Sequence, residues 1–185
     1  AAPASPQGEI RERDERARRV SRVNPVAAYV GIGSNLDDPE RQVRRAIEAL
    51  ALIPGTRLVR ASRLFRTAPW GRTDQPPFVN ATAEIETTLA PPEVLEALLA
   101  IERAHGRHRD GTRWGPRTLD LDVLLYGDVI VDEPGLAIPH PRLAERAFAL
   151  RPLADLDPAL QVPGRGRISE LLERIDANGV EHAEF

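Results

Sequence analysis

The amino-acid sequence predicts an α+β fold in which helices cover one face of an antiparallel sheet, followed by a C-terminal extension. Two observations lead to this expectation. Short β-prone runs and stretches of helical periodicity occur in the order β-α-β-β-α-β, and the third β-prone run, 78–86, has one apolar and one polar side. That order is typical of the split βαβ, or ferredoxin-like, sandwich. We therefore expect the helices to bury one sheet face and to leave the other free for ligands.

The first three elements have clear boundaries. A β-prone apolar run over 26–32 is ended by glycine, serine and asparagine. The acids Asp37 and Asp38 are suited to cap a helix that we expect over 39–52, with a proline in its first turn. A Pro-Gly pair breaks this helix, and a second strand is expected over 58–65.

The second half of the chain repeats the strand–helix–strand pattern. Along the third strand, Val79 and Ala81 point to the apolar side, whereas Asn80 and Thr82 point to the polar side. The expected elements, in chain order, are a loop over 67–77, a strand over 78–86, a helix from Pro91 to near Gly106, an arginine-rich loop over 107–116, a strand over 117–126, and helices near 142–150 and 168–177.

Length and composition indicate one globular domain. The chain has 185 residues, of which 42% are hydrophobic and 29% charged, and one core typically organises about 100 to 200 residues. Residues 1–24 contain a mixed-charge run with almost nothing apolar to bury, so we expect a disordered N-terminal extension there. Residues 25–185 are then expected to form a single domain.

Composition also excludes several kinds of chemistry and disfavours some partners. All 25 basic residues are arginine, which excludes a P-loop lysine, a Schiff base and a lysine general base. The absence of cysteine excludes thiolates and disulfides and fits a reducing compartment. The net charge of -3 gives no global positive field, and no apolar stretch is long enough for a membrane span. We therefore expect a cytoplasmic protein with no nucleic-acid or membrane partner.

Asp120 and Asp122 form the most informative pair of acids. Residues two apart on a strand point to the same face about 7 Å apart, and the apolar residues that alternate with them, through Leu125, are expected to face the core. Adjacent carboxylates repel each other unless a cation compensates them. Their oxygen ligands suit Mg²⁺. A lone Asp-x-Asp pattern, however, more often only faces water.

The loop before these acids favours a ligand site. A nucleoside triphosphate with its metal needs both signs of charge in one place, whereas simple pairing would not require four arginines on a glycine-punctuated loop. Trp114 in the same loop is either an anchor packed on the helix or a platform beside a flat heterocycle. The four arginines are Arg107, Arg109, Arg113 and Arg117.

Histidines give a weaker signal. His140 stands between two prolines and, with Arg146, could contact phosphates, although a single histidine in a turn usually makes only an ordinary hydrogen bond. His105 and His108 are three residues apart near a helix end, but no third metal ligand lies nearby in the sequence. We expect these two histidines to be solvated.

Two residues on the polar side of the third strand suggest a binding site for a flat heterocycle. Asn80 carries an amide donor and acceptor, which match the edge of a pterin or a purine. Phe78 on the same side either stacks on a ligand or packs under the loop over 67–77.

Several segments together resemble one known family over roughly 26–158. The most specific is the long and unusual run Arg-Trp-Gly-Pro-Arg-Thr-Leu-Asp-Leu-Asp at 113–122. The sequence is similar to the 6-hydroxymethyl-7,8-dihydropterin pyrophosphokinases of the folate pathway. The shorter matching segments are Gly33-Ser34-Asn35-Leu36, Phe65-Arg66-Thr67 through Asp74-Gln75-Pro76, Phe78-Val79-Asn80, Ile138-Pro139-His140-Pro141-Arg142 and Arg146-Ala147-Phe148.

The resemblance implies a ferredoxin-like fold and transfer of pyrophosphate from MgATP to the pterin hydroxymethyl oxygen, with release of AMP. It implies that Asp120 and Asp122 hold two Mg²⁺ ions and that Arg107 and Arg117 grip the phosphates as catalytic residues. The implied ATP-binding residues are Glu102, Arg109, Trp114, Arg117, His140 and Arg146. The implied pterin-binding residues are Thr67, Trp70, Phe78, Asn80 and Phe148, with the two phenylalanines on opposite faces of the ring.

The sequence departs from the family at a few places and leaves two other interpretations open. Some members carry tyrosine where this chain has Phe78, so a hydroxyl contact is missing, and the segments before 26 and after about 163 match nothing assignable. A ferredoxin-like RNA-binding module is one alternative, although paired acids would repel phosphate. A metal-dependent nucleotidyl or glycosyl transferase that uses the Asp-x-Asp pair is the other. We expect a monomer that acts on small molecules.

Overall fold

Most of the chain after the N-terminal segment is defined in the computed structural model, which describes residues 24–69, 74–107, 116–177 and 179–183. The extension expected over 1–24 lies almost entirely outside the described residues. Within the described ranges, none of the helices combines the length and the apolar character that crossing a bilayer requires.

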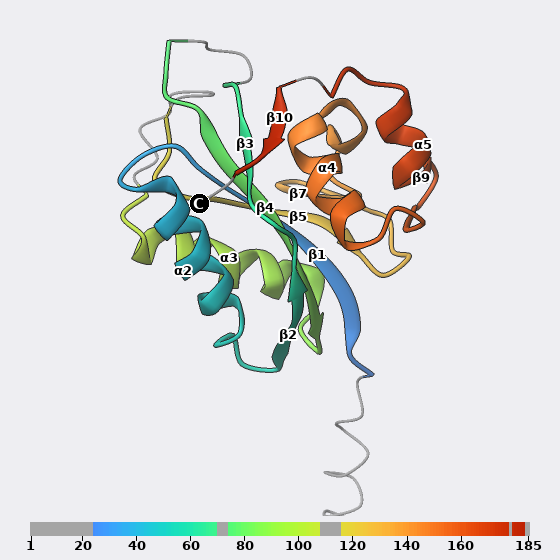
Figure 1. The fold of residues 1–185 in the computed structure, drawn as a ribbon. Coiled ribbons are helices and arrows are strands. Elements are labelled where there is room, and N and C mark those ends of the chain that lie inside the picture. The colour runs from blue at the N-terminus through green and yellow to red at the C-terminus, as the bar shows by residue number, and fades with distance from the viewer. Residues whose placement is uncertain (1–23, 70–73, 108–115, 178, 184–185) are drawn as a thin grey trace, which may run out of the picture.

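One antiparallel sheet organises the fold (Figure 1). Its strands are β1 (Val26–Ser34), β2 (Thr56–Ala61), β3 (Phe65–Thr67), β4 (Phe78–Thr87), β5 (Asp120–Tyr126) and β10 (Val180–His182). They are arranged in the order β10-β3-β4-β1-β5, and β2 pairs with the other end of β4. β1 runs antiparallel to both β4 and β5. This arrangement confirms the predicted ferredoxin-like sheet.

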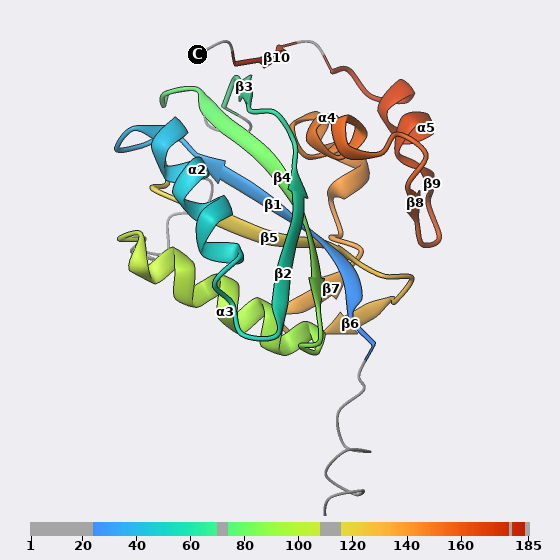
Figure 2. The same ribbon diagram turned by 60° about the horizontal axis from the view of Figure 1, so that its bottom comes forward.

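Two helices, α2 (Pro39–Leu50) and α3 (Pro91–Ala104), cover one face of the sheet, as predicted (Figure 2). α2 begins at the expected place because the Asp38 carboxylate accepts a hydrogen bond from the first turn. α3 ends at Ala104, and the chain turns away two residues later at Gly106, whose φ of 76° suits a residue without a side chain. The core between these helices and the sheet includes Val30, Ile32, Val43, Leu50, Ile85, Leu98 and Val123.

A third helix lies on the opposite face of the sheet (Figure 2). α4 (Ala147–Leu156) buries Leu150 and Leu153 in a second apolar cluster with Tyr29 of β1, and α5 (Ile168–Glu173) packs against α4. The expectation that this face is entirely free for ligands is therefore wrong. The C-terminal part of the chain covers one region of the face and leaves the rest as a pocket.

The single strand expected over 58–65 is divided into β2 and β3 at Ser62. Both strands pair with β4. The Ser62 N–H donates to the Thr82 carbonyl at 2.8 Å, and the Ser62 hydroxyl accepts the Thr82 N–H at 2.9 Å. Because the hydroxyl replaces a backbone acceptor, the strand can be interrupted without leaving a buried N–H unpaired.

β5 contains one residue more than its pairing with β1 requires. Val30 pairs with Val123 and Tyr29 pairs with Leu125, so the ladder skips Leu124. This is a β-bulge, which shifts the alternation of side chains beyond it. Leu125 consequently joins the cluster under α4, and the expectation that it faces the α2–α3 side is wrong.

The helices after β5 also begin and end differently from the prediction. The region expected as a helix near 142–150 is a 3₁₀ turn over Leu143–Glu145 followed by α4, which continues through Pro152. Burial of Leu150 and Leu153 on either side offsets the hydrogen bond that this proline cannot donate. The helix expected near 168–177 is α5, which ends at Glu173.

Two short hairpins occupy segments that showed no clear pattern in the sequence. Gly135 turns the first with a φ of 85°, and the second turns between residues 162 and 166. The paired strands are β6 (Val131–Glu133) with β7 (Leu136–Ile138), and β8 (Gln161–Val162) with β9 (Gly166–Arg167).

β10 adds a strand to the edge of the sheet beside β3 (Figure 1). The imidazole of His182 lies 4.5 Å from the Phe65 ring, measured between centroids. The Ala183 N–H donates to the Leu64 carbonyl at 3.0 Å. β3 is only three residues long, so this second partner holds a strand that otherwise pairs only at its β4 side.

We predict that deleting residues 177–185 lowers the free energy of unfolding by about 1–2 kcal/mol, because it removes the β10 ladder and the His182–Phe65 contact. Thermal melting should show a midpoint lower by about 2–6 °C. Deleting residues 184–185 alone is the control and should leave the midpoint unchanged. Equal melting of all three proteins would contradict the prediction.

Candidate active site

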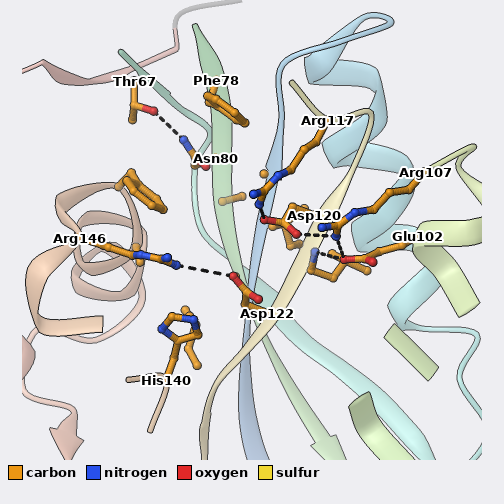
Figure 3. Close-up of a pocket in the computed structure, with 18 of the residues that line it drawn as sticks. Thr67, Phe78, Asn80, Glu102, Arg107, Arg117, Asp120, Asp122, His140 and Arg146 are labelled. Carbon is orange, nitrogen blue, oxygen red and sulfur yellow. Dashed lines mark hydrogen bonds and ion pairs between the residues drawn. The ribbon is translucent and has the colours of Figure 1, made fainter. Parts of the chain in front are cut away.

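A pocket of about 420 Å³ opens on the part of the second sheet face that α4 does not cover (Figure 3). Its floor is formed by β1, β4 and β5, and its walls come from the end of α3 and the start of α4. This volume is in the range of sites for small molecules. The polar residues drawn in the figure are Thr67, Asn80, Glu102, Arg107, Arg117, Asp120, Asp122, His140 and Arg146.

Two glycines of β1 make the floor of the pocket. Gly31 and Gly33 alternate with Val30 and Ile32, so they lie on the second face. A Cβ atom on Gly33 would lie only 2.9 Å from Oδ1 of Asn80, and the nearest Leu124 atom would lie 3.2 Å from a Cβ on Gly31. The pocket is deep here because neither position carries a side chain.

Asp120 is held between two arginines, one that follows α3 and one that stands just before β5. Nη1 of Arg107 lies 2.5 Å from one Asp120 oxygen, and Nη1 of Arg117 contacts the other. Arg107 also pairs with Glu102, whose side chain is 2% exposed. Glu102 in turn accepts the Leu121 N–H at 2.8 Å, so it fastens the end of α3 to β5.

Asp122 points into the pocket on the same strand face and is opposed by Arg146 from the start of α4 (Figure 3). The Arg146 Nη1 to Asp122 Oδ2 distance is 3.8 Å, which is an ion pair without a hydrogen bond. Although 40% of the Asp122 side chain is exposed to the pocket, protein atoms surround it. This burial, together with the Asp120 carboxylate, raises the pKa of Asp122 to about 6.

His140 lies in the wall beside this pair and is neutral at physiological pH. Burial and, secondly, the charge of Arg146 lower the pKa of His140 to about 4. Its Nδ1 accepts the Arg142 backbone N–H at 3.2 Å. That hydrogen bond assigns the proton to Nε2, so the imidazole can donate one hydrogen bond to an acceptor oxygen.

The other end of the pocket combines an amide with two aromatic rings. Asn80 Nδ2 donates to the Thr67 hydroxyl at 2.8 Å, and both side chains are buried (Figure 3). Phe78 of β4 and Phe148 of α4 line the same pocket from the sheet and from the helix. The Arg146 guanidinium lies 5.5 Å from the Phe148 ring centroid. A flat polar heterocycle fits such an end, because rings can stack on it and an amide can bind its edge.

The formal charges of the groups that line the described part of the pocket sum to zero. Three are carboxylates, at Glu102, Asp120 and Asp122, and three are the guanidinium groups of Arg107, Arg117 and Arg146. A bound polyphosphate would therefore add uncompensated negative charge unless it brought cations with it.

The donor set fits Mg²⁺ as an ion shared with a ligand. Among the described residues, no group of three or more acids or histidines is arranged to hold a metal by itself. Mg²⁺ is commonly bound by one or two carboxylates, with phosphate oxygens and water completing its shell. The Asp120–Asp122 pair matches that pattern.

Most of the residues singled out from the sequence meet in this pocket. Of the remaining ones, Arg109, Trp114 and Trp70 lie outside the described residues, as do Arg113 and His108. His105 lies away from the pocket and was expected to be solvated. Its Nδ1 instead lies 2.8 Å from the Gln42 side-chain oxygen, a contact that joins α3 to α2.

Sequence reasoning did not assign a role to three residues that shape the pocket. Gly31 and Gly33 form its floor, and Leu124 lies over Gly31. The two glycines had a usable signal, because glycine at alternate positions of a strand often marks a close approach by other groups. Leu124 had none, since its position depends on the register between β5 and β1.

We predict that Asp122→Asn stabilises the ligand-free protein at pH 8 in the absence of divalent cations. The pKa of Asp122 is raised from 3.8 to about 6, so ionising this group in the folded state costs free energy that builds up as the pH rises from about 4 to 6. Allowing for solvent screening of a partly exposed group, the gain at pH 8 should be at most about 1 kcal/mol and should vanish near pH 4.

Melting curves at pH 4 and pH 8 test this, with Asp155→Asn as the control. Burial raises the pKa of Asp155 too, but the hydrogen bonds from Arg63 outweigh it and hold this pKa below its usual value. The control should therefore be less stable than the parent at pH 8. A melting midpoint for Asp122→Asn that does not exceed the parent's at pH 8 would contradict the prediction.

Comparison with known proteins identifies the family of this chain. The family model described as 7,8-dihydro-6-hydroxymethylpterin-pyrophosphokinase (HPPK) matches residues 29–158. The 2-amino-4-hydroxy-6-hydroxymethyldihydropteridine pyrophosphokinase of Pseudomonas aeruginosa is 49% identical over 153 residues, which are 83% of this chain and 94% of that protein. The protein of the same name from Methylorubrum extorquens is 45% identical over 157 residues, which are 85% of this chain and 98% of that protein.

Solved structures share the fold at lower sequence identity. The wild-type HPPK-DHPS of Plasmodium falciparum, crystallised with pterin and p-hydroxybenzoate, superposes with a TM-score of 0.63 at 14% identity. The match covers 82% of this chain and 43% of that one, so this chain spans less than half the length of the solved protein. At such identity the likeness establishes the fold alone. The family model and the more similar relatives show that this chain belongs to the 6-hydroxymethyl-7,8-dihydropterin pyrophosphokinase family.

Proposed function

We propose that this chain transfers the pyrophosphoryl group of ATP to the hydroxymethyl oxygen of 6-hydroxymethyl-7,8-dihydropterin, a reaction of folate biosynthesis that releases AMP. Membership of the pyrophosphokinase family supports this activity. The structural observation that carries it is one pocket with an aromatic and amide end beside a paired-carboxylate and arginine end. A pterin alcohol and a triphosphate need these two kinds of surface side by side.

The reaction requires alignment more than covalent participation by the protein. A bond forms between the hydroxymethyl oxygen and the β-phosphorus, while the bond from the β-phosphorus to the α,β-bridging oxygen breaks. That oxygen leaves on AMP, and the hydroxyl proton passes to solvent. In-line phosphoryl transfer of this kind is accelerated by positioning and by neutralising charge on the phosphate oxygens.

The pterin is proposed to bind at the aromatic end. Phe78 and Phe148 would stack on its ring, and Asn80, held by the Thr67 hydroxyl, would bind its edge. Trp70, which lies outside the described residues, stays a predicted contact of the same substrate.

The triphosphate is proposed to bind at the charged end. Arg107 and Arg117 are the predicted catalytic arginines, because a guanidinium that contacts Asp120 would lie near phosphate oxygens that share a cation with the same carboxylates. Arg146 and the neutral His140 would donate hydrogen bonds from the wall. Glu102, as a predicted ATP-site residue, would act by holding Arg107 in place. Arg109 and Trp114, which lie outside the described residues, stay predicted contacts of the nucleotide.

Asp120 and Asp122 are proposed to hold Mg²⁺, with two ions expected. When bound there, Mg²⁺ would neutralise phosphate charge and polarise the phosphoryl group under attack. The balanced charges of the pocket lining support this, because a triphosphate alone would leave excess negative charge.

We also propose that the enzyme acts as a monomer in the cytoplasm on small molecules only. Light scattering at micromolar concentration would test the monomer.

One assay tests the proposed function and separates it from the alternatives. The protein is incubated with ATP, Mg²⁺ and the dihydropterin alcohol, and the nucleotides are resolved by chromatography. Pterin-dependent AMP supports the proposal. ADP would indicate an ordinary kinase, pyrophosphate would indicate a nucleotidyl transferase, and unchanged ATP with binding of single-stranded RNA would indicate the binding module.

We predict that Asp122→Asn lowers pterin-dependent AMP formation at least about 100-fold, because it removes one carboxylate from the proposed metal site. The same variant should remain folded and melt no lower than the parent at pH 8. Retention of more than a tenth of the parent's rate at saturating Mg²⁺ would contradict the role proposed for Asp122.

We predict that Gly33→Ala raises the KM for the pterin about tenfold or more, because the added Cβ would meet Asn80 Oδ1 at 2.9 Å and displace the amide from its place beside Thr67. The KM for ATP should change less than threefold. Steady-state kinetics with each substrate varied in turn measures both constants. An equal rise in both would instead indicate general damage to the pocket.

A further inference from the structure

Asn35 occupies a junction between the two halves of the pocket without lining it. It follows β1 directly and is 2% exposed. The segment 74–77, which leads into Phe78 of β4, lies on one side of it, and the segment 116–119, which leads into Asp120 of β5, lies on the other.

Asn35 is bonded to both segments. Its backbone N–H donates to the Arg117 carbonyl at 3.1 Å, and its Oδ1 accepts the Arg117 N–H at 2.8 Å. Its Nδ2 donates to the Gln75 side-chain oxygen and to the Pro76 carbonyl, both at 3.1 Å. The partners fix the orientation of the amide, because an N–H faces its oxygen and two oxygens face its nitrogen.

These contacts join groups that serve different substrates. Arg117 contacts Asp120, at the end of the pocket that suits phosphates. Pro76 is two residues before Phe78, at the aromatic end. A shift of either segment therefore changes the hydrogen bonds that hold the other, and leaving a buried amide partly unpaired is unfavourable.

The neighbouring Ser34 lacks this double connection. Its hydroxyl donates to the Thr118 carbonyl at 2.6 Å and lies 3.4 Å from the Leu36 carbonyl. Ser34 is equally buried. It therefore bonds on the phosphate side without contacting the segment that leads to Phe78, and it offers a matched control.

We propose that Asn35 is a positioning residue that couples the pterin end of the pocket to the triphosphate end, so that binding of one substrate strengthens binding of the other. This inference rests on the proposed function. Coupling between two sites is reciprocal, so nucleotide should tighten pterin binding by the same factor by which pterin tightens nucleotide binding. Because Asn35 bonds to both segments, it transmits the ordering of one segment to the other.

The test measures this coupling factor by calorimetry. The dissociation constant of 6-hydroxymethyl-7,8-dihydropterin is measured with and without a saturating α,β-methylene analogue of ATP and Mg²⁺. For the parent protein we expect the analogue to tighten pterin binding at least about fivefold. A parent protein with no such difference would overturn the inference.

Asn35→Asp is the decisive variant because it keeps the oxygen that accepts the Arg117 N–H and replaces the nitrogen that faces Gln75 and Pro76. Its coupling factor should fall to about one, its KM for the pterin should rise about tenfold, and its affinity for the nucleotide analogue alone should stay within about twofold. Ser34→Ala should retain the parent's coupling factor. Retention of full coupling by Asn35→Asp would overturn the inference, and so would equal loss in Ser34→Ala.

Gln75→Ala keeps the test valid if Asn35→Asp melts at a lower temperature than the parent. This substitution removes the Gln75 side-chain oxygen that accepts a hydrogen bond from the Asn35 amide. Because Gln75 is a partly exposed loop residue, the variant should have a smaller coupling factor without a lower melting midpoint. Unchanged coupling in this variant would also overturn the inference. Failure of the proposed function is distinguishable, because then the parent itself would form no AMP and bind no pterin.

Discussion

Two carboxylates on one face of a single strand repel each other, and the whole site is arranged around that constraint. Asp120 is compensated by Arg107 and Arg117, which come from the end of α3 and the approach to β5. Asp122 is opposed by Arg146 from the start of α4. The acids of β5 therefore hold three other segments in place. Each arginine therefore offsets negative charge that the two neighbouring acids would otherwise leave uncompensated.

α4 links this charged set to the apolar packing of the second sheet face. Near its C-terminal end, Asp155 pairs with Arg63, and the Leu156 carbonyl accepts a hydrogen bond from Arg60 at 2.9 Å. At its N-terminal end it presents Arg146 and Phe148 to the pocket. One rigid helix, fastened to the sheet at its far end, thus fixes a cation and an aromatic ring relative to the carboxylates. A loop carrying the same side chains would place them less firmly.

The parts of the molecule that could be predicted from the sequence are those with a strong local signal. β1, α2, β4, α3 and β5 each have a clear period and recognisable ends, and their order specified the sheet. The alternation of 117–126 also placed Asp120 and Asp122 on one face beside Arg117, where the structure has them. Their chemical roles stay predictions.

The features that were missed depend on contacts between distant segments. The break in the strand at Ser62 depends on a hydrogen bond with the Thr82 N–H. The placement of Leu125 on the second sheet face depends on its pairing with Tyr29 of β1. The cover provided by α4 could not be predicted because its apolar stripe indicates burial without indicating which sheet face it packs against. Asn35 stood within a segment that resembles the family, but its role depends on two loops meeting in space.

The bulge in β5 has a consequence for how this site can vary among related proteins. Leu124 is surplus to the ladder, since Val123 and Leu125 pair with consecutive residues of β1. Losing that one residue would restore a regular strand and leave its neighbours on their present faces, while emptying the space above Gly31. The room beneath a bound ligand can therefore be altered here by a change in chain length, without replacement of any acidic or basic group.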